Sequence, residues 1–106
     1  MIKIAIIGST RYRTMMNEHA DKIANKMVEV RLPFFDNLYK PELQTAQENK
    51  RNIEWSDEVH MFWDGQSAGV IFDMGMCFAL NKKIKIVYIE PRTFANLFKQ
   101  MEESAK

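Results

Sequence analysis

The chain contains one cysteine, Cys77, among its 106 residues, so no disulfide can form within it. Structural disulfides belong to oxidising compartments, and their absence favours a reducing, cytoplasmic location. No apolar run approaches the roughly 20 residues that a membrane-spanning helix needs. The apolar start MIKIAII also lacks the charged flank and the cleavage site of a signal peptide. We therefore expect a cytoplasmic protein without a membrane partner.

An excess of charge is also absent, because 15 basic residues offset 14 acidic ones and leave a formal net charge of +1. Long nucleic acids and anionic membranes attract proteins with clustered positive charge, so we expect no nucleic-acid polymer as a partner. His19 and His60 have no partner at metal-ligand spacing. The sequence therefore predicts no metal site, and no pattern in it calls for a cofactor.

Apolar segments typical of strands alternate with segments of helical periodicity along the whole chain. The pattern predicts strands over residues 2–7, 28–32, 59–63 and 84–89, and helices over residues 14–26, 41–55, 68–81 and 94–101. Such alternation favours a parallel sheet with helices on both faces and right-handed crossovers. We expect one α/β domain over residues 1–106, a flavodoxin-like or Rossmann-like three-layer α/β/α fold whose four strands lie in the order 2-1-3-4.

Ligands of such sheets bind beyond the carboxyl ends of the strands, where the strand order reverses. The loops that follow strands one and three, Gly8–Arg11 and Asp64–Ser67, should therefore lie side by side. Gly8–Arg11 offers a glycine turn, two hydroxyl groups and a guanidinium, which suit an anion. A helix-capping turn with a solvated arginine is the structural alternative. Ser67 opens the next helix, where free amides form an anion site or where its hydroxyl simply caps the helix.

Asp73 is the one charged residue within the apolar stretch that runs from residue 68 to residue 80. A buried carboxylate costs free energy unless something compensates it, and Gly69 and Gly75 are also unfavourable within a helix. Local rules tend to be broken at functional sites. An ionised carboxylate near a helix start can attack an electrophilic carbon, and the macrodipole is expected to keep it ionised. The structural alternative is a carboxylate that ties down backbone amides.

The segment SAGVIFDMG, residues 67–75, closely resembles the S-x-G-x-x-[YFM]-E-[LI]-G segment of the nucleoside 2-deoxyribosyltransferase-like proteins, which include 2'-deoxynucleoside 5'-phosphate N-hydrolases. Residues 8–11 resemble the G-S-x-R turn of that family, and residues 56–59 resemble its A-D-x-V strand start. The resemblance implies that Asp73 is the nucleophile that takes the deoxyribosyl group from the base. It also implies a set of residues that bind the sugar and the phosphate: Gly8, Ser9, Thr10, Arg11, Tyr12, Ser67 and Gly69.

Two residues depart from the family pattern. Asp73 stands where the family has a glutamate and is one methylene shorter, and a displacement of roughly 1 Å can cost about a hundredfold in rate. The family also carries an acid near the end of its second helix that helps to protonate the base. Asn49 stands there, and an amide is no general acid. Glu48 beside it, or Asp64 at the end of strand three, is the substitute that the sequence offers.

We therefore expect an enzyme that breaks the N-glycosidic bond of a 2'-deoxynucleoside or its 5'-monophosphate, by hydrolysis or by transfer to a second base. The alternative is a binding module that holds a nucleotide or a nucleotide-derived signal without turnover. A flavodoxin-like interaction domain is a third reading, which the polar turn at residues 8–13 and Asp73 disfavour. Relatives complete each site from a neighbouring subunit, so we expect a homodimer or a higher oligomer, with the aromatic loop at Phe34 and Phe35 as a donor.

Overall fold

The computed structural model describes residues 1–35, 37, 39–90 and 94–104. Within them, four parallel strands form one sheet in the order β2-β1-β3-β4, which confirms the predicted order. The strands are β1 (Ile2–Gly8), β2 (Val28–Arg31), β3 (Glu58–Trp63) and β4 (Lys83–Ile89). The helices are α1 (Arg13–Ile23), α2 (Glu42–Trp55), α3 (Ala68–Ala79) and α4 (Phe94–Ser104), and a short 3-10 helix, η1 (Thr10–Tyr12), precedes α1.

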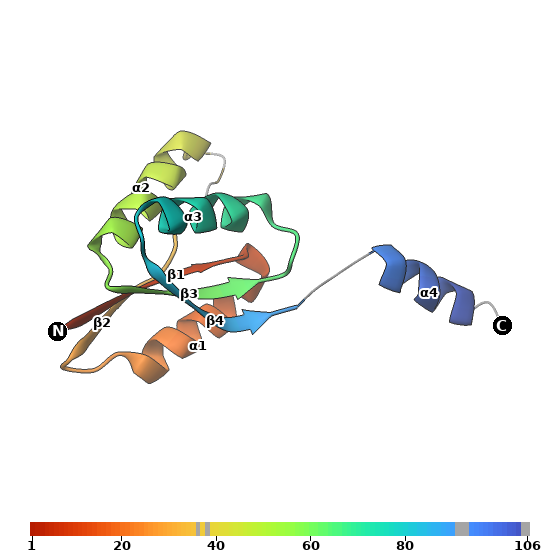
Figure 1. The fold of residues 1–106 in the computed structure, drawn as a ribbon, viewed down its shortest axis with the longest axis horizontal. Helices are drawn as coiled ribbons and strands as arrows, with labels where there is room; N and C mark the ends of the chain where they lie inside the picture. Colours follow the sequence, from red (N-terminus) through yellow and green to blue (C-terminus); the bar gives the residue numbers. More distant parts are fainter. Residues whose placement is uncertain (36, 38, 91–93, 105–106) are drawn as a thin grey trace.

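The sheet is the middle of three layers, with α1 on one face and α2 and α3 on the other (Figure 1). Strand β1 is central, and its residues from Ile4 to Gly8 are buried because both faces are covered. Strand β2 alternates between half-buried and exposed residues, as expected for the edge strand that the sequence predicted. Helix α4 stands apart from the sheet in Figure 1. None of the described helices is long and apolar enough to cross a bilayer.

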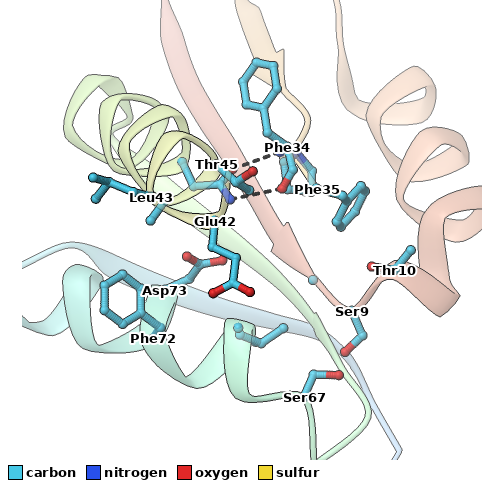
Figure 2. Close-up of a pocket in the computed structure, with 16 residues that line it drawn as sticks. Ser9, Thr10, Phe34, Phe35, Glu42, Leu43, Thr45, Ser67, Phe72 and Asp73 are labelled. Atoms are coloured by element: carbon cyan, nitrogen blue, oxygen red, sulfur yellow. Dashed lines mark hydrogen bonds between the residues drawn. The ribbon is translucent and has the colours of Figure 1, made fainter. Parts of the chain in front are cut away.

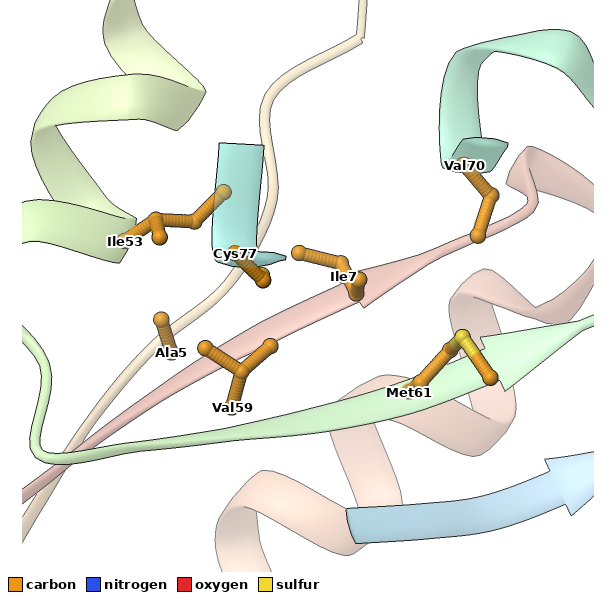
Figure 3. Close-up of a cluster of buried hydrophobic side chains, with 7 residues drawn as sticks. All are labelled: Ala5, Ile7, Ile53, Val59, Met61, Val70 and Cys77. Atoms are coloured by element: carbon orange, nitrogen blue, oxygen red, sulfur yellow. The ribbon is translucent and has the colours of Figure 1, made fainter. Parts of the chain in front are cut away.

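Two apolar clusters hold the layers together. Between the sheet and helices α2 and α3, the buried side chains are those of Ala5, Ile7, Ile53, Val59, Met61, Val70 and Cys77 (Figure 3). On the opposite face, the sheet packs against α1 and η1 through Ile6, Tyr12, Met16, Ala20 and Phe62. Because successive strand residues point to opposite faces, Ile6 and Ile7 belong to different clusters. The two clusters fix where the ends of β1 and β3 lie.

Two helices end earlier than the sequence predicted. Helix α1 ends at Ile23 rather than at residue 26, because Ala24 is extended and Asn25 exchanges two backbone hydrogen bonds with Val28. Helix α3 ends at Ala79, and Asn81 then takes the left-handed conformation with φ of 57°. The Lys82 ammonium group donates to the carbonyl oxygens of residues 54 and 56 at 3.1 and 2.6 Å, so it closes the end of α2.

Candidate functional site

A cavity of about 560 Å³ opens between α2, α3, the end of β1 and the segment at residues 33–35 (Figure 2). This volume lies in the range of small-molecule sites, roughly 300–1,000 Å³. The lining residues are Gly8, Ser9, Thr10, Pro33, Phe34, Phe35, Glu42, Leu43, Thr45, Ala46, Asn49, Ser67, Gly69, Val70, Phe72 and Asp73. The cavity thus lies beyond the carboxyl end of β1 and beside the start of α3, the helix that follows β3. This is the crevice at the reversal of strand order where the topology predicted a ligand.

Asp73 lies in the wall that α3 contributes, on the same buried helix face as Val70 and Cys77, and only 8% of its surface is exposed. Its carboxylate accepts no hydrogen bond and forms no ion pair within the described part of the chain. The alternative in which it ties down backbone amides is therefore not seen there. Burial raises the pKa of Asp73 to about 7. The sequence predicted that the helix macrodipole would keep the group ionised, but the effect of burial is larger. At neutral pH the group is divided between its two protonation states.

The turn after β1 brings Gly8, Ser9 and Thr10 to the cavity. Gly8 has no room for a side chain, because an added Cβ would lie 2.5 Å from the sulfur of Met16 and 2.9 Å from the carbonyl oxygen of Phe62. The Ser9 hydroxyl accepts a hydrogen bond from the backbone amide of Asp64 at 3.4 Å. This contact joins the loops after β1 and β3, which therefore lie side by side as predicted.

Asp64 and Ser67 organise the loop before α3. One Asp64 oxygen accepts from the backbone amides of Gln66 at 3.0 Å and Ser67 at 2.8 Å, and the other accepts from the Ser67 hydroxyl at 3.0 Å. Burial acts to raise the pKa of Asp64, but these hydrogen bonds and one from Ser9 outweigh it and lower the pKa. Asp64 is thus held ionised and is not among the cavity-lining residues. A carboxylate in that state is a poor proton donor to a leaving base.

Two residues of the predicted phosphate-binding turn lie away from the cavity lining. Arg11 places its guanidinium 5.5 Å from the centre of the Tyr12 ring. Tyr12 is buried on the face of the sheet that α1 covers, and its hydroxyl donates to Glu90 at 2.7 Å. Burial, followed by the contact with Glu90, raises the pKa of Tyr12 to about 12. The turn therefore serves both faces of the sheet, and only its first three residues reach the cavity.

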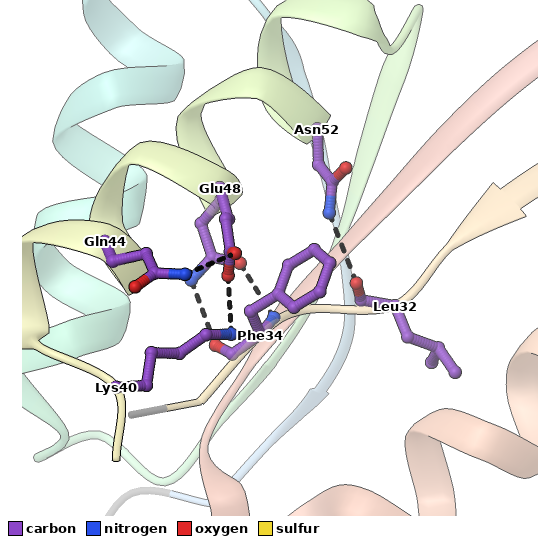
Figure 4. Close-up of polar contacts among 7 residues, drawn as sticks. Leu32, Phe34, Lys40, Gln44, Glu48 and Asn52 are labelled. Carbon is purple, nitrogen blue, oxygen red and sulfur yellow. Dashed lines mark hydrogen bonds and ion pairs between the residues drawn. The ribbon is translucent and has the colours of Figure 1, made fainter. Parts of the chain in front are cut away.

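Asn49 stands at the position where the family has an acid, and its role in this chain is structural. The Asn49 amide accepts from the Phe34 backbone amide at 2.8 Å and donates to the Phe34 carbonyl at 3.1 Å. It thereby pins the segment that forms one cavity wall. Glu48 lies outside the lining and faces Lys40 at 2.5 Å, with Gln44 donating to its other oxygen at 3.3 Å (Figure 4). These contacts, chiefly the one with Lys40, lower the pKa of Glu48.

Glu42 and Thr45 are cavity residues that the site prediction did not include. The Glu42 side chain is exposed and points into the cavity from the first turn of α2 (Figure 2). Thr45 is 8% exposed, and its hydroxyl has no hydrogen-bond partner among the described residues. Together with Ala46 and Asn49 they form one stripe of the helix, since residues three, four and seven apart share a face. Once Asn49 is assigned to the site, this spacing predicts that Glu42, Thr45 and Ala46 also face it.

A second polar cluster lies on the opposite face of the sheet. The rings of His19 and His60 share a hydrogen bond of 2.8 Å, and His60 also contacts Glu58 at 3.3 Å. Burial lowers the pKa of both histidines. Among the described residues, no group of three or more metal-binding side chains has the geometry to hold a metal ion.

No protein-family model matches the chain, and neither a curated protein nor a solved structure matches it. The resemblance to the deoxyribosyltransferase-like proteins thus rests on the three short segments at residues 8–11, 56–59 and 67–75. Any function has to be argued from those segments and from the cavity, which residues of the first and the third of them line.

Proposed function

We propose that the protein breaks the N-glycosidic bond of a 2'-deoxynucleoside or its 5'-monophosphate, with Asp73 as the nucleophile. The observation that carries the proposal is a buried carboxylate, with no partner among the described residues, in the wall of a cavity of about 560 Å³. A buried carboxylate without a partner lowers the free energy of unfolding. A function in which a ligand contacts this group explains why the chain carries it. The reaction class comes from the resemblance of residues 67–75.

In the proposed reaction, an Asp73 oxygen forms a bond to C1' while the C1'–N bond breaks and its electron pair leaves with the base. The product is a deoxyribosyl ester of Asp73. Water then attacks C1', regenerates the carboxylate and releases deoxyribose, or a second base attacks and a new nucleoside forms. Only the ionised form of Asp73 can attack, so the rate should rise as the pH passes the pKa of about 7.

The rest of the cavity supports a nucleoside as the ligand. Phe34, Phe35 and Phe72 supply aromatic surface, against which a planar base can stack. Thr10 places a hydroxyl-bearing side chain at the opposite end of the lining from Phe72 (Figure 2), and such a group suits a hydroxyl of a sugar. A flat apolar part and a polar part are what a nucleoside presents.

The direct test is base release from a panel of deoxynucleosides and their 5'-monophosphates, measured by chromatography, with Asp73→Asn as the matched variant. We expect release by the wild type and its loss, by at least about a hundredfold, in the variant. Release that survives the substitution would remove Asp73 from the mechanism. If no compound releases its base, the proposed enzymatic activity is wrong.

A binding module is the second candidate, and the contacts of three polar residues favour it. Asn49 is committed to the Phe34 backbone, Asp64 to its own loop, and Glu48 to Lys40. None of these groups is left to protonate a leaving base. A nucleoside or nucleotide that raises the melting temperature of the wild type without losing its base would establish this function.

We also propose that the chain forms a homodimer or a higher oligomer through α3. Apart from the buried Asp73, this helix carries no charged residue, and it exposes Ile71 at 52%, Phe72 at 59% and Phe78 at 86%. A helix that is apolar all round is normally covered. Sedimentation should give a dimer or larger species for the wild type and a smaller one for Phe78→Glu. A monomeric wild type at micromolar concentration would contradict the proposal.

A further inference from the structure

The ionisable groups of the cavity wall are all acidic within the described part of the chain. Glu42 and Asp73 line the cavity, and no lysine, arginine or histidine among the described residues does. Arg11 lies over the ring of Tyr12, and Arg13 lies 4.9 Å from the centre of the Phe35 ring. Lys40 lies 4.5 Å from the centre of the Phe34 ring and pairs with Glu48. None of these three cations lines the cavity, so the ionisable side chains of its wall are acidic.

Glu42 is the residue that brings this charge to an entering ligand. Its carboxylate points into the cavity from α2, while Asp73 belongs to α3 on the facing wall (Figure 2). Unlike Glu48 and Glu54 on the same helix, which pair with Lys40 and Lys50, Glu42 forms no hydrogen bond or ion pair within the described residues. An ionised carboxylate only accepts hydrogen bonds. It therefore suits the hydroxyl groups of a sugar and repels a phosphate.

The loop that leads into α3 is another place for a phosphate, but three of its donors are already held by a carboxylate of the chain. Amides and hydroxyls at a helix start are the usual ligands of an anion. Here the amides of Gln66 and Ser67 and the hydroxyl of Ser67 all donate to Asp64. A phosphate bound by the same three donors would have to displace a negatively charged side chain that is held by three hydrogen bonds.

We propose that the cavity takes the uncharged 2'-deoxynucleoside and excludes its 5'-monophosphate, with Glu42 as the residue that sets this selectivity. The inference rests on the proposed function of the same cavity and narrows it to one substrate class. Glu42 accepts from a sugar hydroxyl of the nucleoside and repels a phosphate, and Asp64 holds the donors of Gln66 and Ser67. Ser67 then matches the serine of the family segment in residue type, but its hydroxyl donates to Asp64 and does not bind a phosphate.

The test compares kcat/KM for one deoxynucleoside and its 5'-monophosphate in the wild type, in Glu42→Gln and in Glu54→Gln. Glu54 lies on the same helix, outside the cavity lining, so its variant makes the same change of charge away from the ligand. We expect the wild type to prefer the nucleoside by about tenfold or more. Glu42→Gln should reduce this preference severalfold, and Glu54→Gln should leave it unchanged.

Salt gives an independent readout, because repulsion between charges is screened at high ionic strength whereas steric exclusion is not. The preference of the wild type should shrink as salt is added, and that of Glu42→Gln should respond less. Equal or better use of the monophosphate by the wild type, or a preference that Glu42→Gln leaves intact, would overturn the inference.

Failure of the proposed function gives a different result. If neither compound loses its base, the catalytic proposal fails, and the same pair of ligands is compared by thermal stabilisation. Stabilisation by the nucleoside that exceeds that by the monophosphate, and a smaller difference in Glu42→Gln, still supports the selectivity. Stronger stabilisation by the monophosphate, or stabilisation by neither compound, overturns it.

Discussion

Replacing Asp73 by asparagine should stabilise the protein, and the gain should grow with pH. The pKa of Asp73 is raised by burial from 3.8 to about 7 in the folded state. Between these values the folded state keeps a proton that the unfolded chain has lost, so the free energy of unfolding falls as the pH rises. Asparagine has nearly the same shape and cannot ionise, so it avoids this loss.

The size of the effect follows from the shift, which is about three pKa units at about 1.4 kcal/mol each. The variant should therefore gain up to about 4 kcal/mol above about pH 8 and almost nothing near about pH 4. Urea unfolding of both proteins across this range measures the difference, and contributions of other titrating groups cancel at each pH. A difference that is independent of pH, or a variant that is less stable at about pH 8, would refute the reasoning.

Three further predictions concern the residues that frame the cavity and the second polar cluster. Gly8→Ala should lower the free energy of unfolding by about 1–3 kcal/mol, because its Cβ has no room; an unchanged urea midpoint would contradict this. Asn49→Ala should lower the free energy of unfolding by about 1–3 kcal/mol and speed proteolysis near Phe34, because the backbone groups of Phe34 lose their hydrogen-bond partners. An unchanged cleavage rate would count against the role of Asn49 in holding this segment. Burial lowers the pKa of His19 and His60, so these two groups lower the free energy of unfolding as the pH drops below about 6.5, whereas Asp73 acts in the opposite direction. His19→Gln should therefore gain stability relative to the wild type as the pH falls through this range; a difference between the two proteins that is independent of pH would contradict it.

Local sequence patterns were sufficient for the fold and for the position of the cavity. The apolar run of β1 and its stop at Gly8 mark a buried strand, and the βα alternation restricts the sheet to few topologies. The burial of Asp73 was also visible, because its neighbours in sequence are apolar on every side. The order of the strands then placed the loops after β1 and β3 together.

The roles of individual polar residues depended on contacts between distant parts of the chain. Asn49 meets the backbone of Phe34, 15 residues earlier, and Lys82 meets carbonyls at the end of α2, at least 26 residues earlier. A short motif contains no information on such contacts. The motif that resembles a phosphate-binding segment likewise gave no sign that Asp64 would accept from Ser67. Side-chain partners of this kind follow from the packed structure alone.

The central claim is that Asp73 attacks C1' of a deoxynucleoside, and trapping of the ester tests it most directly. A nucleoside with fluorine at C2' in the arabino configuration slows the breakdown of such an ester, because the oxocarbenium-like transition state is destabilised. After incubation, mass spectrometry of the wild type should show one added fluorinated sugar, located on the peptide that contains Asp73, and Asp73→Asn should carry none. An unmodified wild type, or a sugar attached to any other residue, would contradict the account.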